Sequence, residues 1–355
     1  MNRWNKATAA GILAAVLAAS SLAGCGSAKG TDTALVINGE NVSLGTVEMM
    51  TRYQQAETTS LLTMYGLAQQ GSVWASQYSA ATSTEEAQTF GQNLKKDVKD
   101  KFVQEIVLKQ HAEEFGVSIP ESLEADMAAA ADENFAANQA AYEAQQISRD
   151  DVYKMLELQT IEALMRKPMV AETDRNVSDE EAKQSSISYA RISLTTTNSE
   201  NAQEDVSDAD KKVYKSQMEE LISQLKKAED TAAADMSSYA NAINDQIAVT
   251  TYSYGTDYTL PDAVIEAASK LKDGEICEEV IDTGDYYYVV RMDHVFDEEA
   301  TQTKKDSIIS EREQTIYETK LKEWTDAAEV EEKKPFQDLE VSDKNGFTVK
   351  QQESN

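Results

Sequence analysis

Few side chains in this sequence belong to the types that most often bind metals or act as nucleophiles. The chain of 355 residues has two histidines, His111 and His294, and two cysteines, Cys25 and Cys277. A protein zinc site takes three or four clustered ligands, which these four residues do not supply. A Ser-His-Asp triad would have to use one of the two histidines, and no motif surrounds either. We therefore predict no metal site and no cofactor.

Of the two cysteines, Cys25 lies near the N-terminus in a context that suggests covalent modification. Arg3 and Lys6 precede an apolar run over residues 9–22, which is too short to span about 30 Å of hydrocarbon comfortably. This pattern is typical of a secretory signal peptide, here residues 1–24. The sequence Leu22-Ala23-Gly24-Cys25 resembles the bacterial lipobox, in which the cysteine receives a lipid. An ordinary signal peptide with a cysteine near its cleavage site is the alternative.

A lipidated Cys25 would become the new N-terminus, and residues 25–32 would form a small, polar tether. More than one acyl chain gives stable membrane anchoring. We therefore expect the protein on the extracytoplasmic face of the bacterial cell membrane, attached by lipid. Cys277 is left without an intrachain partner, and we expect it to be a small buried side chain.

Composition and charge disfavour further classes of fold and function. Hydrophobic residues make up 41% of the chain, which is enough for packed cores. The formal net charge is −30, so no basic surface is expected for nucleic-acid phosphates. Only 14 glycines and 4 prolines occur, which disfavours a turn-rich all-β fold.

The periodicity of the remaining chain indicates an α+β protein in two parts. Residues 33–180 begin with a hairpin signal at Asn38-Gly39 and continue as amphipathic helices. Residues 185–298 have the order β-α-α-β-α-β-β. A long helix over residues 300–334 then returns to the helical lobe, which is therefore discontinuous. Residues 335–355 are expected to be an acidic and polar C-terminal tail.

In this order of elements the chain resembles the PrsA-type extracytoplasmic foldases and their relative SurA. Three stretches carry the resemblance: residues 34–42 (ALVINGENV), residues 112–120 (AEEFGVSIP), and residues 260–292, which include AASKLKDGEI. The resemblance implies a helical chaperone lobe with an inserted parvulin-type peptidyl-prolyl isomerase domain. It also implies unfolded or nascent secreted proteins as partners, and it allows a homodimer.

The family's active site holds a buried pair of histidines beside an apolar proline pocket. At the two histidine positions this sequence has Arg191 and Tyr288. Leu260 and Val264 match the pocket positions, and Asp245 and Asp257 lie near the place of the family's acidic or thiol group. Arginine is always charged and only donates hydrogen bonds, whereas a histidine pair needs an acceptor nitrogen. We therefore expect the fold of the insert to be kept and its isomerase activity to be weak.

Three functions remain open from the sequence. The leading one is a membrane-anchored foldase or holdase with weak isomerase activity, in which methionine-rich apolar surface of the helical lobe holds unfolded chains. The second is a fully active peptidyl-prolyl isomerase whose altered residues are compensated. The third is a solute-binding lipoprotein, which the long helical lobe disfavours because that class needs two α/β lobes.

Overall fold

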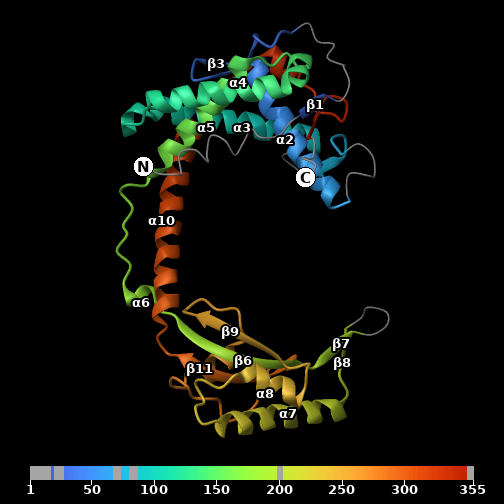
Figure 1. Ribbon diagram of the computed structural model, residues 1–355, viewed down its shortest axis with the longest axis vertical. Coiled ribbons are helices and arrows are strands. Elements are labelled where there is room, and N and C mark those ends of the chain that lie inside the picture. Colours follow the sequence, from blue (N-terminus) through green and yellow to red (C-terminus); the bar gives the residue numbers. More distant parts are fainter. Residues whose placement is uncertain (1–16, 20–27, 67–72, 80–86, 198–202, 350–355) are drawn as a thin grey trace. The chain divides into compact units, whose positions relative to one another are not determined.

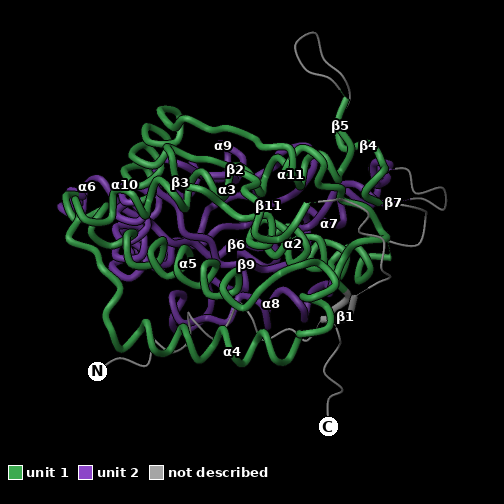
Figure 2. Tube along the Cα trace, turned by 90° about the horizontal axis from the view of Figure 1, so that it is seen from above, with its two compact units in different colours: residues 1–172, 314–355 green, residues 173–313 purple. Residues whose placement is uncertain are grey.

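The computed structural model describes residues 17–19, 28–66, 73–79, 87–197 and 203–349. The chain divides into two compact units, and each is described by itself (Figure 2). Unit 1 comprises residues 1–172 and 314–355, and unit 2 comprises residues 173–313. The discontinuous arrangement expected from the sequence is therefore present. Cys25 lies outside the described residues, and of the expected signal peptide only β1 (Leu17–Ala19) is described.

A small antiparallel sheet in the order β12-β2-β3 opens unit 1. Its strands are β2 (Thr33–Ile37), β3 (Glu40–Ser43) and β12 (Val330–Glu332). The turn between β2 and β3 is formed by Asn38 and Gly39, whose φ angles of 47° and 83° are those of a tight hairpin turn. The hairpin predicted from this dipeptide is confirmed.

Most of the rest of unit 1 is helical, and its hydrophobic core lies between these helices. They are α2 (Leu44–Met64), α3 (Phe90–His111), the 3₁₀ turn η1 (Glu113–Phe115), α4 (Glu121–Ala144), α5 (Arg149–Met169), α11 (Lys334–Gln337) and the C-terminal part of α10 (Glu298–Ala327). Two short ladders accompany them: β4 (Gln77–Ser79) with β5 (Gln88–Thr89), and β1 with β13 (Phe347–Val349). Phe102, Ile106, Val107 and Val152 are almost completely buried, as expected for inward faces of amphipathic helices.

One carboxylate ties the first turns of α2 and α5 together. Asp151 Oδ1 accepts hydrogen bonds from the hydroxyls of Ser43 and Thr46 at 2.6 and 2.8 Å. Its Oδ2 accepts from the backbone N–H and the hydroxyl of Ser148, which completes a capping box. A Cβ on Gly45 would lie 2.4 Å from Oδ2, so only glycine leaves room for this contact. Because both helix N-termini favour negative charge, Asp151 stabilises both helices.

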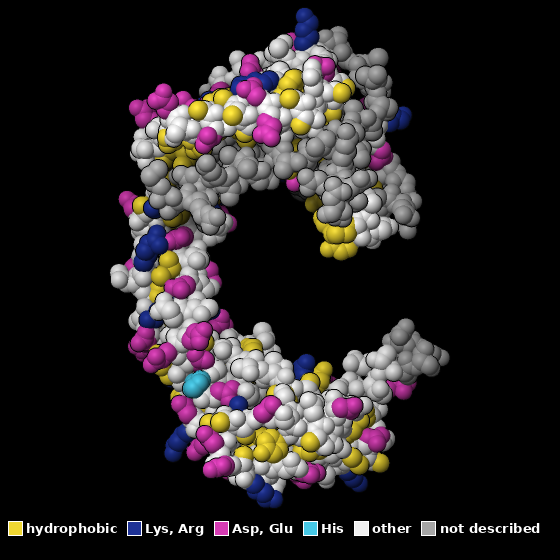
Figure 3. Space-filling model, in the orientation of Figure 1, with side chains coloured by type: hydrophobic (Ala, Val, Ile, Leu, Met, Phe, Trp, Pro, Cys, Tyr) yellow, Lys and Arg dark blue, Asp and Glu magenta, His cyan; other side chains and the backbone are white. Residues whose placement is uncertain are grey.

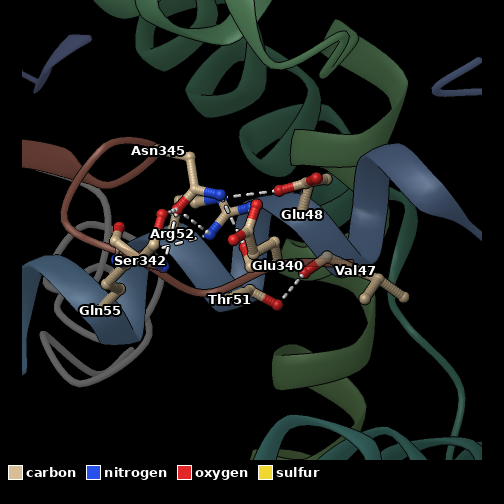
Figure 4. Close-up of polar contacts among 8 residues, drawn as sticks. All are labelled: Val47, Glu48, Thr51, Arg52, Gln55, Glu340, Ser342 and Asn345. Carbon is tan, nitrogen blue, oxygen red and sulfur yellow. Dashed lines mark hydrogen bonds and ion pairs between the residues drawn. The ribbon is translucent and has the colours of Figure 1, made fainter. Parts of the chain in front are cut away.

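The segment after residue 334 belongs to the core of unit 1. Phe336, Leu339 and Phe347 are buried, although the polar composition of residues 335–355 predicts a tail. Arg52 of α2, itself 1% exposed, fixes this segment (Figure 4). Its guanidinium donates to the Glu340 carbonyl oxygen at 2.8 Å and to Asn345 Oδ1 at 3.2 Å. Phe336 and Leu339 are three residues apart, but Phe347 follows only eight residues later among mostly polar residues, so the sequence suggests a tail.

Unit 2 contains a four-stranded antiparallel sheet in the order β10-β11-β6-β9 (Figure 1). In chain order its elements are α6 (Asp179–Ala182), β6 (Ser185–Ser193), α7 (Asp208–Lys226), α8 (Met236–Ile243), β9 (Ala248–Tyr254), α9 (Asp262–Ala268), β10 (Ile281–Asp282) and β11 (Tyr286–His294). The predicted order β-α-α-β-α-β-β is thus confirmed. A hairpin of β7 (Thr195–Thr197) and β8 (Gln203–Asp205) is added between β6 and α7.

Helix α10 is shared between the two units, whereas the sequence assigns it to the helical lobe. Its first part, up to Glu313, belongs to unit 2 (Figure 2). There Arg312 donates to the Asp174 and Asn176 carbonyl oxygens, and its guanidinium lies 2.6 Å from the Glu181 carboxylate. These contacts attach residues 174–181 to the helix. No helix among the described residues is both long and apolar enough to cross a membrane.

Candidate functional site

The sheet of unit 2 has two different faces, because alternate residues of a strand point to opposite sides. One face carries Ala190, Ile192 and Val289, which pack with Met218, Leu221 and Leu225 of α7. Such a layer is an ordinary sheet-on-helix core. The other face carries the residues that the sequence analysis places in an active site.

Five tyrosines lie on that second face and form what we call the tyrosine face. They are Tyr189 of β6, Tyr252 and Tyr254 of β9, and Tyr286 and Tyr288 of β11. The ring centroids of Tyr189 and Tyr288 are 5.7 Å apart, and those of Tyr286 and Tyr288 are 5.9 Å apart. The rings of Tyr252 and Tyr254 are stacked, with their centroids 6.2 Å apart. Helix α9 covers part of this face with buried Val264, Ile265 and Ala268.

Arg191 and Tyr288 meet in this arrangement. They are directly opposite each other in the β6–β11 ladder. The Arg191 guanidinium carbon lies 4.9 Å from the centre of the Tyr286 ring, a cation–π geometry. A side-chain hydrogen bond with Tyr288 is the main cause that raises the pKa of Arg191. Arg191 is half-buried and Tyr288 is 2% exposed, so the charged group lies at the border of an aromatic core.

The other predicted site residues are distributed around this pair. Leu260 is half-buried beside the tyrosines, whereas Val264 is completely buried among them. Asp257 is exposed and forms an ion pair with Lys304 at 2.9 Å, and this hydrogen bond lowers the pKa of Asp257. Asp245 is exposed in the turn between α8 and β9, at the end of the sheet's edge strand. The structure therefore brings together Arg191, Tyr288, Leu260 and Val264, but not the two aspartates.

The remaining thiol and both imidazoles lie elsewhere. Cys277 is 5% exposed, as expected, and burial raises the pKa of its thiol while the Val290 N–H donates to its sulfur. His111 stacks on the Trp324 ring at 4.1 Å in unit 1. His294 is exposed at the end of β11. Across the described ranges, no three His, Cys, Asp or Glu side chains are placed to hold a metal ion.

Tyr189, Tyr254 and Tyr288 are buried in the core beneath the site. Binding of a ligand is therefore open to the half-buried Tyr252, Tyr286 and Arg191. A guanidinium can donate to a peptide carbonyl oxygen, and tyrosine rings can pack on a proline ring or an aromatic side chain. Neither group offers the acceptor nitrogen of a neutral imidazole. Tyr189, Tyr252, Tyr254 and Tyr286 were not predicted as site residues. The available signal was the spacing of two residues between Tyr252 and Tyr254 and between Tyr286 and Tyr288.

Comparison with known proteins agrees with this geometry. Residues 181–308 match the family of the PPIC-type PPIASE domain. No curated protein matches the sequence significantly. The matched residues start in α6 and end in the first part of α10, so they include the whole tyrosine face.

Several solved structures are similar over most of the chain. The foldase PrsA of Lactococcus lactis is 14% identical, with 85% of this chain and 95% of that chain covered and a TM-score of 0.34. The foldase PrsA of Streptococcus pneumoniae is 14% identical, with 72% and 96% covered and a TM-score of 0.27. A SurA-like chaperone of Campylobacter jejuni is 11% identical, with 85% and 100% covered and a TM-score of 0.22. The predicted resemblance is confirmed over residues 181–308, which match the PPIC-type PPIase domain and, in the sequence, lie between the two segments of unit 1.

Proposed function

We propose that this protein is a membrane-anchored extracytoplasmic foldase that binds unfolded secreted proteins and has weak peptidyl-prolyl isomerase activity. The observation that carries the proposal is the pairing of Arg191 with Tyr288 across β6 and β11, inside a PPIC-type domain. The domain supports binding of proline-containing segments. The two residues support weak catalysis, because neither reproduces the network of a histidine pair.

The surface of the protein also supports a role in binding unfolded clients. Acidic side chains are spread over both units on the face drawn in Figure 3. Leu61, Met64, Tyr65 and Tyr78 of unit 1 are large apolar side chains that are 51–71% exposed. Exposed apolar side chains offer contacts to unfolded chains, and a high negative charge keeps the chaperone itself soluble.

Isomerase activity and suppression of aggregation, measured on one preparation of the full chain, test this proposal. We expect clear suppression of the aggregation of an unfolded client and slow turnover of Xaa-Pro peptides. A fully active isomerase is the competing outcome, and its turnover of these peptides would lie in the range of typical enzymes.

Anchoring is a separate part of the proposal and depends on Cys25. Replacing Cys25 by serine should abolish labelling with a radioactive or clickable fatty acid and should release the protein from membranes, because serine lacks the thiol that receives the lipid. The measurement is metabolic labelling followed by membrane fractionation, with Cys277→Ser as the matched control because Cys277 is buried. Membrane retention of the Cys25→Ser protein would contradict a lipid anchor.

A further inference from the structure

Unit 1 contains a cavity that the proposed function does not use. It has a volume of about 220 Å³ and lies between α2, α3 and α5. Met49, Met50 and Met155 supply its apolar walls, together with Tyr53, and all three methionines are at most 5% exposed. Binding sites for drug-sized ligands are typically about 300–1,000 Å³, so this cavity fits roughly one side chain.

Unpaired hydrogen-bond acceptors line this cavity. Both carboxyl oxygens of Glu105 and the side-chain oxygen of Gln159 are buried and have no hydrogen-bond partner among the described residues. The Glu105 side chain is completely buried. Buried acceptors without donors are rare because each one loses its hydration without compensation. Among the described residues, no group therefore donates a hydrogen bond to these three oxygens.

The nearby lysine does not fill this role. Lys101 Nζ lies 3.7 Å from Glu105 Oε1, beyond hydrogen-bond distance. Its hydrogen bonds go instead to both carboxyl oxygens of Glu162, at 2.7 and 2.6 Å. Glu57 is a further carboxylate at the cavity, and it is exposed. Lys101 is thus hydrogen-bonded to Glu162, and the buried Glu105 carboxyl group has no hydrogen-bonded cation among the described residues.

We propose that this cavity binds a cationic side chain with an apolar stem, namely an arginine or lysine side chain of an extended polypeptide. The ammonium or guanidinium group would donate to Glu105 and Gln159, and charge-assisted hydrogen bonds of this kind are the strongest available to a carboxylate. The stem would pack on the methionines, whose flexible and polarizable side chains adapt to different partners. Only the source of the side chain, an unfolded client, rests on the proposed function.

Binding of a cation here should depend on pH. Burial is the main cause that raises the pKa of Glu105 to about 7; the charge of Lys101 opposes this shift and that of Glu162 adds to it. The other titratable groups at the cavity are Glu57 and Tyr53 of α2. A protonated Glu105 cannot pair with a cation, so the proton competes with the ligand. Affinity should therefore rise by about tenfold between pH 6 and pH 8.

Methionine methyl groups provide the readout. The full chain is labelled with ¹³C at the methionine methyls and titrated with N-acetyl-arginine N-methylamide, and separately with the citrulline analogue, which has the same shape and no charge. We expect saturable shifts of the Met49, Met50 and Met155 signals with the arginine probe only, stronger at pH 8. Glu105→Gln, which keeps the shape of the side chain, should weaken binding at least tenfold. Glu57→Gln at the exposed rim should change it no more than about twofold.

Equal shifts with the arginine and citrulline probes would overturn the proposal, as would no shift up to tens of millimolar probe. Unchanged binding by Glu105→Gln would also overturn it, because the cation would then be bound elsewhere. Circular dichroism of each variant checks that the helices are intact. Because the probes are single amino-acid derivatives, a negative result here leaves the foldase proposal standing, and failure of that proposal leaves cation binding testable.

Discussion

Replacing Arg52 by methionine should lower the free energy of unfolding of unit 1 by about 3–5 kcal/mol, the usual cost of removing one partner of a buried ion pair. The Arg52 guanidinium binds Glu48 at 2.7 Å, and the two side chains are only 2% and 14% exposed. It also donates to Gln55 Oε1, to Asn345 Oδ1 and to the Glu340 carbonyl oxygen. Methionine fills much of the same volume but removes the donor of the buried Glu48 carboxylate and of Gln55 Oε1. Asn345 Oδ1 and the Glu340 carbonyl oxygen keep their hydrogen bonds from Ser342 and Asn345.

Tryptophan fluorescence in a urea titration measures this effect in unit 1 alone. Of the three tryptophans, Trp74 and Trp324 lie in described parts of unit 1, and unit 2 contains none. Lys322→Met is the matched control: its ion pair with Asp326 is 73% and 62% exposed, so the change should stay within about 0.5 kcal/mol. Adding Glu48→Leu to Arg52→Met should recover much of the loss, since no charge is then left buried. An Arg52→Met protein as stable as the Lys322→Met protein would contradict the network.

Replacing Phe336 by alanine should cost about 3–5 kcal/mol of the stability of unit 1, the range for large aromatic side chains in a core. Phe336 is 2% exposed in the core of this unit, and Lys95 Nζ lies 5.0 Å from the centre of its ring. The cavity left by alanine cannot be filled by a side chain of this fixed segment, because Arg52 holds the residues that follow it.

Urea titration with tryptophan fluorescence again measures this loss, with Tyr65→Ala as the control at a position that is 68% exposed. We expect the control to change stability by no more than about 0.5 kcal/mol. If both substitutions had equally small effects, residues 335–349 would be a tail and not part of the core.

The elements that could be predicted from the sequence are those with strong local signals. Asn38-Gly39 can adopt the positive φ angles of a tight turn, and this fixes the first hairpin. Ser148 with Asp151 forms a capping box that marks the start of α5. The strands of the inserted domain alternate or are continuously apolar, so their order among the helices could be predicted.

The parts that could not be predicted depend on contacts between distant segments. Strand β12 has three residues and exists because it pairs with β2, nearly 300 residues earlier in the chain. The order of the tyrosines on one face becomes visible only when β6, β9 and β11 are in register. Glu105 is one carboxylate among 63 acidic residues, and its burial follows from the packing of three helices. Residues whose positions depend on contacts between distant segments have no local pattern that a single sequence could show.

The most direct test of the proposed function is whether the domain that contains Arg191 and Tyr288 catalyses isomerisation only weakly. The measurement is kcat/KM of the full chain on a panel of peptides varied at the residue before proline, by exchange spectroscopy, with aggregation of an unfolded client followed on the same preparation. Arg191→Met serves as the control for contaminating isomerases. Weak catalysis predicts values below about 10³ M⁻¹s⁻¹, under the roughly 10⁴–10⁸ M⁻¹s⁻¹ of typical enzymes, together with clear suppression of aggregation. A value on any peptide that is within about tenfold of that range, from about 10³ M⁻¹s⁻¹ upward, and that is lost in Arg191→Met would contradict weak catalysis and support a fully active isomerase.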